Sequence, residues 1–107
     1  MREAAGNGGD RIALETVLAN IAGELERLTA RAQRLDEAVG EMLVAGSGPA
    51  PRAALLQDMD LLRQSLDCMQ VLMHNLSRET DGGAAVSAAG AARGVYLAAL
   101  RRACLHR

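Results

Sequence analysis

The pattern of apolar and polar positions along the chain predicts two long amphipathic helices. Between residues 11 and 45, apolar side chains recur at alternating steps of four and three residues, which is the a/d spacing of a heptad repeat. The first stripe consists of Leu14, Leu18, Ile21, Leu25, Leu28, Ala32, Leu35, Val39 and Met42. The second stripe, within residues 52–79, consists of Leu55, Met59, Leu62, Leu66, Met69, Met73 and Leu76. Both stripes predict helices that pack knobs into holes.

A short turn separates the two predicted helices. Residues 46–51 read Gly-Ser-Gly-Pro-Ala-Pro, and Pro51 suits the first position of a new helix, where its missing N–H is harmless. Because a connection this short brings consecutive helices side by side, we expect an antiparallel hairpin. Further apolar residues widen the surface of the second helix, so we expect it to contact more than one neighbour: Leu56, Leu61, Cys68 and Leu72.

The flanking segments complete one domain. We expect residues 1–9 to form a flexible tail, with Asp10 capping the first helix, and residues 10–80 to form the helical hairpin. Residues 81–107 read as a linker, ending near Gly94, and a C-terminal amphipathic helix over residues 95–106. This helix has two alternatives, packing on its own hairpin or binding a partner.

Composition supports an all-α fold. The chain has 107 residues, enough for one domain, and Tyr96 is its sole aromatic residue, so Leu, Ala, Val and Met must fill the core. A lone hairpin leaves apolar surface in water, so we expect two copies to form a four-helix bundle as a homodimer. A three-helix monomer is the alternative.

Charge and cysteine usage exclude several classes of function. The net charge is −1 and the twelve basic residues, all Arg, are scattered, so we expect no nucleic-acid partner. No apolar run reaches the ~20 residues that cross a bilayer, and residues 1–10 are Gly-rich and polar, so we expect a cytoplasmic protein with no membrane partner. Cys68 and Cys104 are then reduced, buried thiols, and with His74 and His106 they lack the spacing of a metal site.

The densest polar cluster spans residues 57–67. Asp60 and Gln64 are four residues apart, so a helix places them on one face, about one turn apart, pointing outward. Arg63 lies three residues after Asp60 and four before Asp67. An ordinary solvated helix face with local ion pairs explains this spacing equally well.

The segment Asp60-Leu61-Leu62-Arg63-Gln64 resembles the Asp-x-x-x-Gln signature of the CheZ-type phosphatases, which act on chemotaxis response regulators. Gln57-Asp58 is similar to the Gln-Asp upstream of that signature, offset by one residue, and the small size resembles the alphaproteobacterial CheT-like group. The likeness covers little more than residues 57–64 and their hairpin.

The resemblance implies a dimeric hairpin whose partner is a CheY-like response regulator. Gln64 would orient the water that attacks the phospho-aspartate, and Asp60 would pair with the active-site lysine of the regulator. Gln57, Asp58, Arg63 and Asp67 would contact the partner, although Arg63 stands where the family has a small residue. The chain would need no cofactor of its own, because the regulator supplies Mg²⁺.

Two other classes of function fit the sequence. A non-catalytic helical adaptor or dimerisation module would show an exposed apolar patch. A histidine phosphotransfer domain would use His74, although Ser77-Arg78 stand where such domains usually have Lys-Gly. The phosphatase requires Asp60 and Gln64 to be exposed, adjacent and unshielded.

Overall fold

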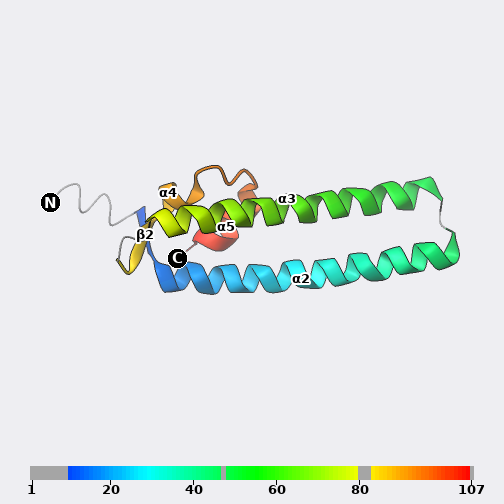
Figure 1. Ribbon diagram of the computed structural model, residues 1–107, viewed down its shortest axis with the longest axis horizontal. Coiled ribbons are helices and arrows are strands. Elements are labelled where there is room, and N and C mark those ends of the chain that lie inside the picture. Colours follow the sequence, from blue (N-terminus) through cyan, green and yellow to red (C-terminus); the bar gives the residue numbers. More distant parts are fainter. Residues whose placement is uncertain (1–9, 47, 80–82, 107) are drawn as a thin grey trace.

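The computed structural model describes residues 10–46, 48–79 and 83–106, and it confirms the all-α fold with its long helical hairpin (Figure 1). Helix α2 (Leu14–Ala45) and helix α3 (Pro49–Glu79) run side by side in opposite directions. The molecule is elongated, with extents of 65 × 20 × 19 Å. The expected tail over residues 1–9 lies outside the described residues.

The base of the hairpin contains a small sheet where the sequence predicted helix. Strand β1 (Arg11–Ala13) pairs antiparallel with strand β2 (Ala85–Ser87), so the prediction that the first helix begins near Arg11 is wrong. Ile12 lies opposite Val86, and both side chains are buried, which an extended backbone permits.

The prediction that Asp10 caps the first helix is wrong. Its carboxylate accepts hydrogen bonds from the Ser87 hydroxyl and the Ala89 N–H, at the start of helix α4 (Ala88–Ala92). The N–H of Leu14, the first residue of α2, instead donates to the Ala84 carbonyl at 2.8 Å. Asp10 therefore joins two segments that are distant in the chain.

The predicted linker is partly wrong as well, because residues 85–92 form β2 and α4 against the hairpin. Asn75 on α3 is buried, and its amide nitrogen donates to the carbonyls of Ala91 (2.8 Å) and Arg93 (2.6 Å). Val95 is buried but lies outside any helix, and the last helix, α5, spans Ala98–Leu105 and begins three residues later than predicted.

Helix α5 packs on its own hairpin, which decides between the two alternatives for the C-terminal helix. Leu100 and Cys104 are buried, and Asn20 of α2 donates to the carbonyls of Cys104 (3.1 Å) and His106 (2.9 Å). In Figure 1, α5 crosses behind α3. Cys68 and Cys104 are both buried free thiols, as predicted.

The turn between the long helices follows the sequence closely. Gly46 adopts the left-handed conformation at φ 66°, and its N–H donates to the Met42 carbonyl at 2.9 Å. Glycine has no Cβ to oppose this conformation, which explains why α2 ends there. Helix α3 begins at Pro49, slightly before the predicted Pro51.

Within one chain, the buried members of the two heptad stripes all lie at d positions. The d positions face the other long helix, and several are buried: Ile21, Leu28, Leu35, Met69 and Leu76. The neighbouring c and g positions contact α4 and α5, as Asn20, Cys68, Leu72 and Asn75 illustrate. On the opposite side, five large a-position side chains remain 41–48% exposed: Leu18, Leu25, Met59, Leu66 and Met73.

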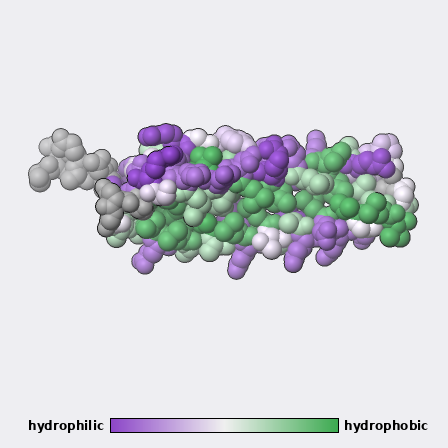
Figure 2. Space-filling model, in the orientation of Figure 1, coloured by the Kyte–Doolittle hydropathy of each residue, from purple (hydrophilic) through white to green (hydrophobic). Residues whose placement is uncertain are grey.

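We call this surface the open face. It is formed by the a positions of both long helices, on the side away from α4 and α5. Figure 2 views the hairpin from this side, and green apolar side chains run along its length. As expected of a lone hairpin, part of the apolar surface is left in water, and it is the a positions that stay exposed.

Candidate functional site

Asp60 and Gln64 lie together on the edge of α3 that points away from α2. They occupy b and f positions, opposite the d positions that face α2. The Gln64 side-chain nitrogen donates to the Asp60 carboxylate at 2.7 Å, and Asp60 is exposed while Gln64 is half-buried. We call this surface, with Gln57 and Asp67, the outer edge. The structure therefore brings the two predicted catalytic residues side by side.

Arg63 shields the Asp60 carboxylate. Its guanidinium donates to Asp60 at 3.1 Å and to Asp67 at 2.6 Å, so it bridges the two acids. These hydrogen bonds, first from Arg63 and then from Gln64, lower the pKa of Asp60 below its usual value, so this carboxyl is ionised at neutral pH. The requirement for an unshielded Asp60 is not met in this arrangement.

The arginine bridge is easily opened. At least half of each side chain in it is exposed, so water competes for every hydrogen bond that Arg63 makes. Exposed ion pairs of this kind contribute little to stability, because solvent screens them and ordering long side chains costs entropy. A partner that offers Asp60 a better cation can therefore displace Arg63.

Gln57 and Asp58, adjacent in sequence, lie on different surfaces. Gln57 is exposed and occupies the same heptad position as Gln64, so it belongs to the outer edge. Asp58 instead lines a hollow between the long helices with Arg31 and Arg34. The structure therefore does not bring Asp58 to the predicted site.

Tyr96 is a residue of this region that the sequence analysis missed. It lies on the segment before α5, beside Cys68 and near Asp67 and Arg63, and it is more than half exposed. Partial burial, and then the neighbouring Cys68, raise the pKa of its phenol. The one available signal was its rarity, since an exposed aromatic residue is a common anchor in protein interfaces.

His74 also lies on the outer side of α3. It shares the heptad position of Asp60 and Asp67 and is exposed, as a phosphotransfer histidine must be. The Ser77 hydroxyl donates to its backbone carbonyl at 2.8 Å.

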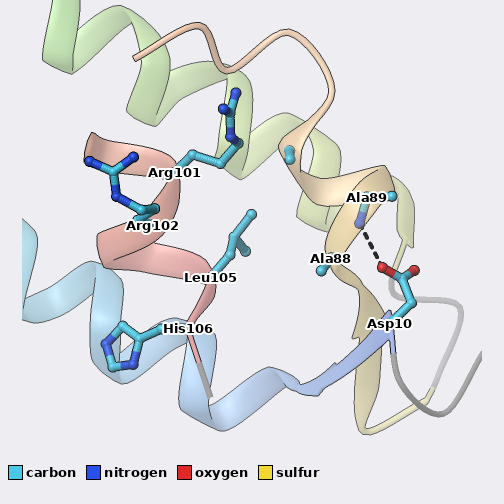
Figure 3. A pocket seen from close by; sticks show the side chains of 8 residues that line it. Asp10, Ala88, Ala89, Arg101, Arg102, Leu105 and His106 are labelled. Carbon is cyan, nitrogen blue, oxygen red and sulfur yellow. Dashed lines mark hydrogen bonds between the residues drawn. The ribbon is translucent and has the colours of Figure 1, made fainter. Parts of the chain in front are cut away.

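A second hollow lies between α4 and α5 (Figure 3), and three alanines and Leu105 line it together with Asp10, Arg101, Arg102 and His106. Arg101 and Arg102 project away from Asp10 in this view. Asp10 is bound to Ser87 and Ala89, and the Arg101 guanidinium donates to the Val95 carbonyl at 2.8 Å. Asp10 and Arg101 thus hold chain segments together, which is a structural role.

The open face carries an apolar hollow of its own, midway along the hairpin. Its charged rim consists of Asp36 on α2 and Arg63 on α3. The remaining lining is apolar: Ala32, Leu35, Val39, Met59, Leu62 and Leu66.

The described residues limit two other classes of site. No helix within residues 10–46, 48–79 and 83–106 has the length and apolar character needed to cross a membrane. In the same part of the chain, no three His, Cys, Asp or Glu side chains are grouped to hold a metal ion.

Comparisons with known proteins identify a family for almost the whole chain. No curated protein and no solved structure matches it. A family model described as a domain of unknown function, DUF8776, matches residues 10–107, which include every helix and strand of the fold. The chain belongs to the DUF8776 family.

Proposed function

We propose that this chain is a CheZ-like phosphatase or docking factor for a phosphorylated, CheY-like chemotaxis response regulator. The observation that carries the proposal is the 2.7 Å hydrogen bond from Gln64 to Asp60 on the outer edge of α3. A carboxamide and a carboxylate held together on a rigid helix can enter the active site of another protein as one unit.

The hydrogen bond suits the chemistry. Hydrolysis of an aspartyl phosphate needs a water held in line and charge stabilised around the phosphoryl group, and a glutamine that orients water serves this purpose in GTPases. Because the Gln64 nitrogen donates to Asp60, its carbonyl oxygen remains to accept a hydrogen bond from the attacking water. The regulator would supply Mg²⁺ and a lysine.

Arg63 must move for docking. In the proposed complex the lysine of the regulator takes the place of the Arg63 guanidinium on Asp60, so one cation exchanges for another. The exposure of Arg63 supports this exchange, because its side chain can swing into solvent without opening the core.

The proposal includes a homodimer. Five large apolar side chains of the open face are 41–48% exposed, and they occupy a positions, which face a partner helix in coiled coils. A second hairpin on this face would complete a four-helix bundle. The outer edge points away from α2, and neither Asp60 nor Gln64 lines the hollow of the open face, so dimerisation would leave both side chains accessible.

The test is the dephosphorylation of candidate phosphorylated response regulators from the same cell. Wild-type protein should accelerate phosphate loss, and Gln64→Ala should reduce the acceleration at least about tenfold, as for the loss of a group that positions a proton or water. Asp60→Ala should weaken docking. Gln33→Ala is the matched control, because Gln33 is an exposed glutamine on α2. No acceleration by wild type, or an unchanged Gln64→Ala, overturns the phosphatase, and a failure to bind any phosphorylated regulator overturns the docking factor.

A non-catalytic dimerisation module or adaptor is the second candidate, and the open face favours it. It predicts self-association of wild type together with no effect on any regulator. Both candidates predict self-association, so the rate of phosphate loss is the measurement that separates them.

A further inference from the structure

The open face has one edge along α2 and one along α3, and at the same height along the hairpin axis these two edges carry opposite charges. Asp36 on α2 and Arg63 on α3 border the same apolar hollow, from the e positions that flank the a stripes. Both residues are exposed. Within one chain, Arg63 forms its ion pairs with Asp60 and Asp67 on its own helix, and the hollow separates it from Asp36.

The neighbouring levels along the face are matched in the same way. Moving one heptad toward the turn reaches Leu43 on α2 and Leu56 on α3, because the helices are antiparallel, and these side chains are 81% and 60% exposed. Moving one heptad toward the base reaches Thr29 and Gln70, both polar and exposed. At three successive levels, therefore, the two e positions carry an apolar pair, an acid with a base, and a polar pair.

A two-fold dimer would bring these matched residues together. If a second copy packs on the open face with its two-fold axis parallel to the long helices, α2 of one copy lies on α3 of the other at the same level. Each e position of α2 then faces the matching e position of α3 across the interface. This arrangement brings Asp36 to Arg63, Leu43 to Leu56 and Thr29 to Gln70.

The other two-fold arrangement is less favourable. A two-fold axis perpendicular to the long helices would set α2 against α2. The acids Glu15, Glu26 and Asp36 are exposed at the e and b positions on this side of α2, so that arrangement would set two acidic rims against each other.

We propose that the chain forms a parallel two-fold dimer through the open face, in which Asp36 of each copy pairs with Arg63 of the other. The Arg63 guanidinium then has two carboxylates to bind, Asp60 of its own chain and Asp36 of the second copy. Association draws the guanidinium away from Asp60 and opens that carboxylate to a partner. The dimer geometry stands on its own, whereas this role for Asp60 rests on the proposed function.

The test uses two charge-reversed variants, Asp36→Arg and Arg63→Asp. Each alone places like charges across the interface, two arginines in the first case and two aspartates in the second. We expect each variant to self-associate at least about tenfold more weakly than wild type, measured by sedimentation equilibrium. An equimolar mixture restores both acid–base pairs in a heterodimer, so native mass spectrometry should show the heterodimer in excess over either homodimer.

The controls are Glu37→Arg and Arg34→Asp, which make the same charge changes at exposed α2 positions that do not line the hollow of the open face. They should associate like wild type. Recovery in the mixture would also show that both interface variants fold. The inference fails if the interface variants associate like wild type, if their mixture shows no preferred heterodimer, or if wild type stays monomeric. None of these readouts uses a response regulator, so a negative phosphatase assay is a separate result that removes only the role for Asp60.

Discussion

The side-chain nitrogen of Asn75 lies 2.8 Å from the carbonyl oxygen of Ala91 and donates a hydrogen bond to it. The same nitrogen donates to the Arg93 carbonyl, and the Asn75 side-chain oxygen accepts from the Arg78 guanidinium at 3.1 Å. One buried amide on α3 thus satisfies two carbonyls at the end of α4. It fixes the segment that leads into α5.

We therefore predict that Asn75→Ala destabilises the protein by about 1–3 kcal/mol, because one buried and one partly buried carbonyl lose their donor. Urea denaturation followed by circular dichroism measures the change. Gln57→Ala, at an exposed position of the same helix, should stay within about 0.5 kcal/mol of wild type. Equal stability of Asn75→Ala and wild type would contradict the role given to this amide.

Arg63 should control the ionisation of Asp60. Removing the guanidinium in Arg63→Gln takes away the main group that lowers the pKa of Asp60, so that pKa should rise toward its ordinary value. A carboxyl with a lowered pKa in the folded protein stabilises it above the unfolded pKa and loses that contribution as pH falls through the folded pKa. Carboxyl carbon NMR across an acid titration measures the shift, and Arg31→Gln is the control. An identical titration curve for Asp60 in Arg63→Gln and wild type would show that the bridge does not persist in solution.

Cys104 should make the protein less stable in alkali. Burial, and secondarily the charge of Glu24, raise the pKa of this thiol to about 11 from an ordinary value of 9.0. Between these two pH values the unfolded chain loses the proton and the folded chain keeps it, so the free energy of unfolding falls as pH rises, by up to roughly 2–3 kcal/mol. Denaturation at pH 8 and pH 10.5 measures the slope. Cys104→Ala should lower stability at both pH values and show a shallower slope, and an unchanged slope in this variant would refute the prediction.

Leu66 on the open face should matter for association and little for folding. Its side chain is 48% exposed within one chain, so Leu66→Lys removes little buried surface from the monomer. At a dimer interface the same change would bury a charge, and we expect at least about tenfold weaker self-association. Sedimentation equilibrium measures this effect. Leu72→Lys gives the contrast, because Leu72 is fully buried and its replacement should unfold the chain.

The two long helices were predictable because their heptad spacing is a local property of the sequence. The spacing could not reveal which half of each stripe the chain buries by itself, since that depends on where α4 and α5 pack. Leu18 and Ile21 look equivalent in the stripe, yet Ile21 is buried and Leu18 is 46% exposed.

The short elements depended on contacts between distant parts of the chain. Strand β1 has three residues, too few for a periodic signal, and it forms because Ile12 meets Val86. Asp10 has the residue type of a helix cap, but it caps α4 and not the helix that follows it in sequence.

The candidate site was half predictable. The four-residue step from Asp60 to Gln64 fixed their proximity, and the heptad position of Asp58 already placed it on another surface than Gln57. The position of Tyr96 beside Cys68 and Asp67 required the packing of the whole C-terminal segment.

The strand pair at the base gives the hairpin two ends of unequal stiffness. At the base, three contacts hold distant parts of the chain together: β1 pairs with β2, Asp10 binds Ser87, and Asn20 binds the end of α5. At the tip, two helices meet at a covalent turn, with Leu43 and Val44 mostly in water. The two long helices are therefore joined at both ends, by noncovalent contacts at the base and by the covalent turn at the tip, so any thermal separation of the arms must be largest between the two ends.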